Sequence, residues 1–356
     1  ASLQLLPVAT RQPLGGAAAR APALIWWLYT PGVACLALGM GAARPAFAAA
    51  GAAAVALALV AFAALLARNL RGARGMPAVV AHGWAALGCL IVALATALSL
   101  VWAWLGAPPL ARATSLALHV AFAAYGFMGL LALGLAYILV PMFALAPNPD
   151  ERRALASCGL ALAALSFAAL AAFGFAPMAL RSAAVGLGAA ALVLHLRLMR
   201  AALAGGMRRE LGRSFVLVRF AWAMLALSLA LALALALDAP LPGLDALFGL
   251  VLVGGWLLSF LLGMLQRILP FLASMHAGGA GPGRSRRPPT PSALTAERPL
   301  AWHLACHFAA LAGVALGIAS GQGAVVTAAA LVGAAGAAAF GAFFIILLRR
   351  LQGAAR

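Results

Sequence analysis

The stretch "LHVAFAAYGFMGLLALGLAYILVPMF", Leu118 to Phe143, is a long apolar run with one histidine, His119, next to its start. The run is longer than the roughly 20 apolar residues that a helix needs to cross the hydrocarbon core of a bilayer. It therefore predicts a membrane-spanning helix. An imidazole inside such a helix needs an explanation, because polar groups in lipid are costly and often mark functional sites.

The same apolar character extends over most of the chain, which is 66% hydrophobic and only 8% charged. A soluble chain of 356 residues could not hide that much apolar surface, so lipid must be its main solvent. We predict an all-α, polytopic integral membrane helical bundle of about ten transmembrane helices. The ten apolar runs are 22–42, 46–67, 77–105, 113–145, 153–174, 177–203, 214–238, 243–274, 301–319 and 323–348.

The charge is strongly basic, with 24 arginines, no lysine and six carboxylates. Such a balance often indicates a nucleic-acid partner, but here the arginines lie at the ends of apolar runs, as in membrane proteins. We therefore predict the lipid bilayer as partner and no nucleic acid. Only Arg44, Arg112 and Arg181 fall in loops on the side opposite the N-terminus, so the positive-inside rule predicts cytoplasmic N- and C-termini.

The predicted organisation has five parts. They are a cytoplasmic N-terminal segment (1–21), a membrane domain with spans one to eight (22–274), a flexible cytoplasmic loop (275–300), spans nine and ten (301–348) and a cytoplasmic tail (349–356). The loop follows from the Gly, Pro and Ser content of "GGAGPGRSRRPPTPSALTAERP". The first apolar run is predicted as a span, not a signal peptide. No sequence repeat is sharp enough to identify.

No Asp or Glu lies in the middle of a predicted span, so the histidines are the main candidates for functional groups within the membrane. That pattern argues against a proton pump or a proton-coupled transporter. His119 lies about 10 Å along its helix from Arg112. Small residues on its face, including Gly126, suggest room for a porphyrin, and neutral imidazole is a common haem ligand. His82 has a similar setting above Cys89. The alternative is close helix packing, with each imidazole bonded to a neighbouring carbonyl.

Other polar residues leave two interpretations open. His303 and His307 are four apart and share a helical face, which suits either a metal site or a hydrated pair at the interface. We expect His195 to snorkel to the interface together with nearby arginines. Arg267 either snorkels or pairs with a buried anion such as a haem propionate. The four cysteines form no CxxC motif and are predicted to be small packing residues.

The opening stretch resembles the histidine-bearing helix of haem-copper oxidase catalytic subunits, especially the C-type oxidases and their nitric oxide reductase relatives. In that family the histidine ligates the low-spin haem. The matching residues here are His119, Tyr125-Gly126-Phe127, Gly129 and Tyr137-Ile138-Leu139-Val140.

A nearer resemblance is to a group of shorter, uncharacterised bacterial proteins that are distantly similar to the NnrS membrane haem proteins. Their motifs correspond to "YILVPMFALAP" at 137–147 and "GMLQRILPFLASMH" at 263–276. The resemblance covers spans three to nine. It implies a bacterial inner-membrane protein that binds haem b, with His119 as the best-matched ligand and His82, Gly126, Arg267 and His276 as further cofactor-binding candidates.

The chain departs from true oxidases because it has no "HH" pair and no "HPEVY"-like segment for a copper site. We therefore expect no copper and no terminal oxidase activity. The first hypothesis is a haem protein for electron transfer, response to NO or O2, or respiratory assembly. The second is a permease for a small solute or metal ion that uses His82, His276, His303 and His307. The third is a cofactor-free structural subunit of a respiratory complex. The sequence indicates no oligomeric state.

Overall fold

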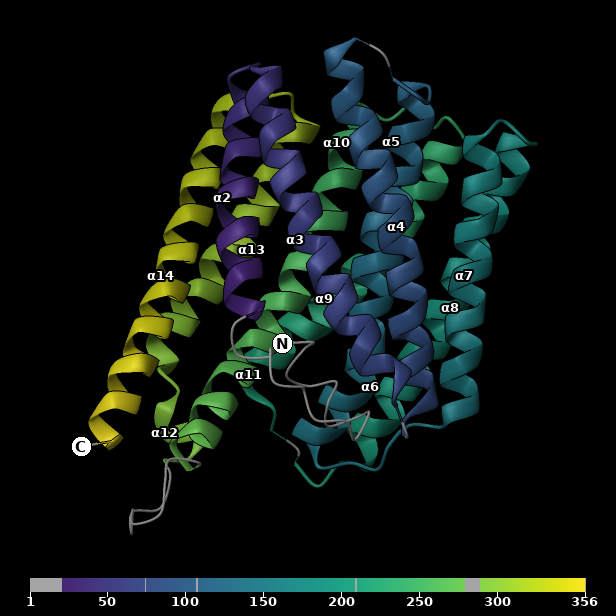
Figure 1. Cartoon of the computed structure of the whole chain (residues 1–356). Coiled ribbons are helices and arrows are strands. Elements are labelled where there is room, and N and C mark those ends of the chain that lie inside the picture. The colour runs from purple at the N-terminus through teal and green to yellow at the C-terminus, as the bar shows by residue number, and fades with distance from the viewer. Residues whose placement is uncertain (1–20, 74, 107, 209, 279–288, 356) are drawn as a thin grey trace. The chain divides into compact units, whose positions relative to one another are not determined.

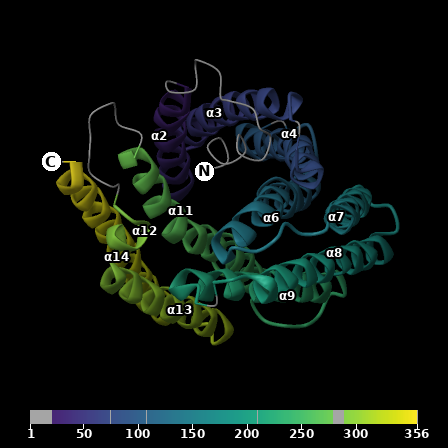
Figure 2. The same ribbon diagram turned by 90° about the horizontal axis from the view of Figure 1, so that it is seen from below.

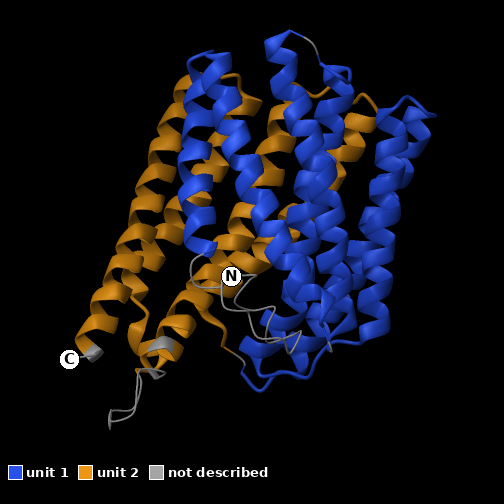
Figure 3. Ribbon diagram, viewed as in Figure 1, with its two compact units in different colours: residues 1–209 blue, residues 210–356 orange. Residues whose placement is uncertain are grey.

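The computed structural model describes residues 21–73, 75–106, 108–208, 210–278 and 289–355. Within these ranges the regular structure is helical, and ten helices are long and apolar enough to cross a membrane. The all-α, polytopic prediction is therefore confirmed. The predicted N-terminal segment lies, apart from Ala21, outside the described residues. The chain divides into unit 1, residues 1–209, and unit 2, residues 210–356 (Figure 3).

The described residues of unit 1 form six spans, of which the fourth changes helix type along its length. The last two spans form a hairpin in which α7 and α8 lie side by side, and α4 packs along the fourth span (Figures 1 and 2). The elements are α2 (Ala21–Gly41), α3 (Pro45–Arg71), α4 (Pro77–Leu105), α5 (Arg112–Val120), the π-helix η1 (Ala121–Gly129), α6 (Leu130–Ala144), α7 (Glu151–Ala172) and α8 (Pro177–Gly205).

The helix ends in unit 1 follow local chemistry. Proline stands at the first turn of α3, α4 and α8, where its missing N–H leaves no hydrogen bond unmade. The side chain of Asp150 caps α7 by accepting from the backbone nitrogen of Arg153 at 2.8 Å. Gly174, with φ of 89°, turns the chain between α7 and α8. The short break predicted between spans five and six is confirmed.

Four spans lie within the part of unit 2 that the structure describes. They are α9 (Gly212–Ala236); the composite of α10 (Leu244–Gly249), the π-helix η2 (Leu250–Leu258) and α11 (Ser259–Gly278); α13 (Glu297–Ala319); and α14 (Gly323–Ala355). A short helix, α12 (Pro291–Leu294), precedes α13. The predicted loop 275–300 is thus too wide at both ends, because α11 continues to Gly278 and α13 begins at Glu297. Its centre, residues 279–288, lies outside the described residues.

The composite spans of the two units have the same internal pattern. Adding 129 to the numbers of Gly126, Gly134 and Pro141 gives Gly255, Gly263 and Pro270, and the same shift carries η1 onto η2. Each composite span thus has a π-helix, two glycines and a helix-interior proline at matching positions.

The two glycines of each composite span also contact the preceding helix at matching heights. Gly134 and Gly126 approach His82 and Cys89 on α4, while Gly263 and Gly255 approach Leu217 and Met224 on α9. His82 and Leu217 are 135 residues apart, and so are Cys89 and Met224. Those four contacts define the repeat.

The span that follows the composite span also matches between the two units. Glu151, the first residue of α7, bonds to Ala78, the second residue of α4. Glu297, the first residue of α13, bonds to Arg213, the second residue of α9. Three spans in each unit therefore follow one motif, a repeat that was not sharp enough to identify in the sequence. The two copies of the motif share only a few identical residues, so the repeat is clearer in the contacts between helices than in the amino-acid sequence.

Candidate functional site

His119 lies in the last turn of α5, immediately before the π-helix η1. Its Nδ1 atom is 3.0 Å from the carbonyl oxygen of Ala93 on α4. A carbonyl only accepts, so Nδ1 carries the proton and donates it, which leaves a lone pair on Nε2. No other polar contact of His119 is found among the described residues. The half-buried ring is therefore fixed in orientation and tautomer, with one nitrogen available.

Two further hydrogen bonds hold α5 in place. The hydroxyls of Ser99 on α4 and Ser115 on α5 are 2.9 Å apart and buried. The hydroxyl of Thr114 donates to the carbonyl of Ala172 on α7 at 3.2 Å. Ser115 is one turn before His119 and on the same helical face, so the serine pair supports the position of the imidazole.

The space expected beside the glycines of this span is absent. A Cβ atom added at Gly126 would lie 2.7 Å from Cβ of Cys89, and one added at Gly134 would lie 2.6 Å from Cβ of His82. The expectation that Gly126 leaves room for a flat cofactor is therefore wrong. In a membrane bundle, small residues let helices approach closely. The carbonyl bonds that the alternative of close packing predicts are found at His82 and His119.

A second cluster in unit 1 joins His82 on α4, Tyr137 on α6 and His195 on α8. The centroid of the Tyr137 ring lies 5.4 Å from that of the His82 ring and 5.1 Å from that of the His195 ring, and both pairs are packed edge to face. The three side chains are at most 1% exposed. The prediction that His195 snorkels to the interface is therefore wrong: its ring packs on Tyr137.

Tyr137 belongs to the motif that carries the resemblance, but the sequence alone did not indicate it as a site residue. The available signal was its place in a span with no other polar side chain nearby. His82 and His119 are not brought together, because Ala93 lies about 16 Å along α4 from His82 at the rise of an α-helix. The two imidazoles therefore cannot ligate one iron.

In unit 2, His303 and His307 share one face of α13, as predicted. Their rings are stacked with centroids 5.8 Å apart. Nδ1 of His303 donates to the carbonyl of Gly336 at 3.0 Å, and Nε2 of His307 lies 2.7 Å from the hydroxyl of Ser259. Both rings are buried, so the alternative of a hydrated interfacial pair is wrong.

Metal binding by this pair stays a prediction. In the described part of the chain no group of three or more His, Cys, Asp or Glu side chains could hold a metal ion. His303 and His307 therefore offer two imidazoles from one helix, fewer protein ligands than the three or four usual for zinc.

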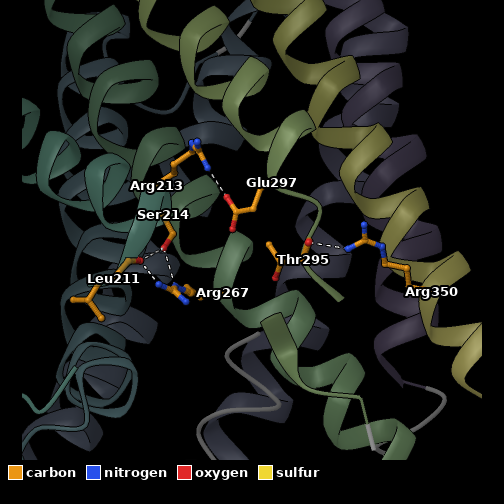
Figure 4. A network of polar contacts seen from close by, with 7 residues as sticks. All are labelled: Leu211, Arg213, Ser214, Arg267, Thr295, Glu297 and Arg350. Atoms are coloured by element: carbon orange, nitrogen blue, oxygen red, sulfur yellow. Dashed lines mark hydrogen bonds and ion pairs between the residues drawn. The ribbon is translucent and has the colours of Figure 1, made fainter. Parts of the chain in front are cut away.

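Arg267 on α11 points at the start of α9 (Figure 4). Its Nε donates to the hydroxyl of Ser214 at 2.9 Å, and its guanidinium also donates to the carbonyl of Leu211. The nearby pair of Arg213 and Glu297, 2.5 Å apart, and the bond from Arg350 to the carbonyl of Thr295 join further elements of unit 2 (Figure 4). Arg267 thus links α11 to α9. The side chain of His276 is outside the described residues.

Searches of family models, curated proteins and solved structures find no match to this chain. The resemblance to haem-copper oxidase-like and NnrS-like proteins therefore stays a prediction that depends on the motifs alone.

Proposed function

We propose that this protein binds haem b in the membrane, with His119 as an axial ligand, and serves electron transfer, response to NO or O2, or respiratory assembly. The observation that supports it is the bond from Nδ1 of His119 to the carbonyl of Ala93. Metal-ligating histidines usually donate their other ring N–H to such a partner, which fixes the tautomer and strengthens the ligand.

The chemistry of the donor fits haem, whereas the glycine face does not. Nε2 of His119 has a lone pair and no described partner, as a ligand to iron requires. Gly126 and Gly134 are covered by Cys89 and His82, so neither belongs to the proposed site. The Ala93 carbonyl would hold the imidazole proton, and the serine pair would hold α5. When bound, haem supplies one-electron exchange and binding of diatomic gases.

The proposal is tested by the absorption spectrum of detergent-purified protein made with ample haem. We expect a Soret band in oxidised and reduced protein. His119→Ala should lower the haem content at least tenfold, and added imidazole should restore part of it by replacing the missing ligand. Leu116→Ala is the matched control, because Leu116 lies on the same helix and is 51% exposed. A colourless wild-type protein, or an unchanged Soret band in His119→Ala, would contradict the proposal.

One alternative has an observation in its favour. The closed contacts of Gly126 and Gly134 and the carbonyl bonds of the histidines complete the packing of the fourth span without a ligand. This suits a cofactor-free structural subunit of a respiratory complex. A colourless protein that co-purifies with respiratory-chain subunits would favour it. Haem-free uptake into proteoliposomes that depends on His303 and His307 would instead favour the permease.

A further inference from the structure

The cluster of His82, Tyr137 and His195 contains a buried hydrogen-bond acceptor for which the described residues provide no donor. Nδ1 of His82 lies 2.8 Å from the carbonyl oxygen of Ala78, so Nδ1 carries the proton and Nε2 the lone pair. That Nε2 is buried and has no hydrogen-bond partner among the described residues. In lipid, an unpaired acceptor is unfavourable, and in native proteins such groups usually have a partner such as ordered water.

The neighbouring phenol offers the complementary group. The hydroxyl of Tyr137 is buried and makes no hydrogen bond of ordinary geometry to the described residues, although it interacts with the side chain of Ser157. Ser157 itself donates to the carbonyl of Ala191 at 3.0 Å, one turn before His195 on α8. Four helices, α4, α6, α7 and α8, therefore direct polar side chains to one buried place.

The second copy of the three-span motif shows that packing does not require this histidine. Leu217 on α9 occupies the place of His82 and also lies against a glycine: a Cβ atom added at Gly263 would be 3.1 Å from Cβ of Leu217, next to Ser214 and Val218. Gln266 occupies the place of Tyr137. An aliphatic side chain can thus fill the same contact, so shape alone does not explain the imidazole at position 82.

We propose that His82, Tyr137 and His195 form a binding site for one water molecule, separate from the proposed haem ligand His119. The water donates to Nε2 of His82 and accepts from the hydroxyl of Tyr137. Water satisfies both groups because it is a donor and an acceptor at once, and buried waters typically make about three hydrogen bonds. At the matching place in unit 2, Leu217 offers no acceptor.

Solid-state NMR of the full-length protein in lipid bilayers, with ¹⁵N-labelled histidine, tests this site. The His82 signals are assigned by their loss in His82→Leu, a change that the second motif copy shows to fit the contact. We expect an unprotonated Nε2 with a hydrogen-bonded shift and strong magnetisation transfer from water. His307, whose Nε2 lies 2.7 Å from the Ser259 hydroxyl, is the internal control and should show little transfer.

Tyr137→Phe gives an independent test and does not depend on the folding of His82→Leu. We expect it to reduce water transfer to the remaining shifted imidazole signal by at least half, because the water loses one of its donors. A wild-type spectrum without water transfer to the unprotonated nitrogen whose signal is lost in His82→Leu would overturn the proposal. So would a stoichiometric transition metal, measured by mass spectrometry, that is lost in His82→Leu. A spectrum that is unchanged in Tyr137→Phe would also overturn it.

Discussion

The carboxylate of Glu151 accepts a hydrogen bond from the backbone nitrogen of Ala78 at 2.9 Å, although the two residues are 73 positions apart. Ala78 lies in the first turn of α4, where backbone N–H groups have no partner within the helix and attract negative charge. The carbonyl of the same residue accepts from His82. Glu151 thus fixes the turn that orients the buried imidazole.

Removing this carboxylate should loosen α4. We expect Glu151→Ala to lower the unfolding free energy by about 1–2 kcal/mol, since a charge-assisted bond to a helix N-terminus is lost. Glu297→Ala in unit 2 is the control. Its partner Arg213 is exposed, and exposed ion pairs contribute about 1 kcal/mol at most. Reversible unfolding in mixed detergent measures both. Equal losses of unfolding free energy in the two variants would contradict the expectation that the bond of Glu151 contributes more than the ion pair of Glu297.

The glycines of the fourth span should not tolerate a methyl group. Gly134→Ala places a Cβ atom 2.6 Å from His82, and Gly126→Ala places one 2.7 Å from Cys89. We expect each to lower stability by about 1–3 kcal/mol through overpacking. Gly159→Ala and Gly186→Ala are controls in open space on neighbouring helices and should be neutral or slightly stabilising. Thermal unfolding measures the stability of all four variants. Equal effects of the four substitutions would refute close packing at Gly126 and Gly134.

Replacing His82 by leucine and Leu217 by histidine, which exchanges the equivalent residues of the two motif copies, should have unequal effects on the melting temperature. We expect His82→Leu to fold with little change in melting temperature, because Leu217 at the matching position also lies against a glycine. Leu217→His should melt several degrees lower, since it buries an imidazole in a fully buried position without a prepared partner. Thermal unfolding in one detergent compares them. A greater loss in His82→Leu than in Leu217→His would argue against the equivalence.

The hydroxyl pair of Ser99 and Ser115 should show energetic coupling. Both are buried and 2.9 Å apart, so removing one hydroxyl leaves the other unpaired. We expect Ser99→Ala and Ser115→Ala each to cost about 1 kcal/mol, and the double variant to cost less than their sum. Urea or detergent unfolding of the double-mutant cycle measures the coupling. Full additivity would mean that the pair does not hold α5 against α4.

The number and type of the spans could be predicted because they depend on local properties. The third span is predicted at 77–105 and found as α4, Pro77–Leu105, since a proline and a glycine limit an unbroken apolar run. The π-helices η1 and η2 were not predicted, because an apolar run does not show where the hydrogen-bond pattern changes from four residues to five. The repeat was not identified from the sequence, because only two glycines and one proline in each composite span carry its pattern.

The candidate sites were less predictable. The sequence identifies His82 and His119 as unusual, since an imidazole in lipid is costly wherever it packs. It could not show that Gly126 faces Cys89, because a glycine in an alanine-rich helix fits an open cofactor face and a tight helix contact equally well. Nor could it place His195 against Tyr137, because those residues are distant in sequence.

The sequence by itself determined that this chain is a multi-pass, all-helical membrane protein, because length and hydropathy of a segment decide whether lipid can be its solvent. Only the tertiary structure decided which nitrogen of each tethered imidazole is bonded and which keeps its lone pair. It also decided that His82, Tyr137 and His195 meet. Such pairings depend on the rotation of each helix about its axis, which neighbouring helices set through contacts between distant residues.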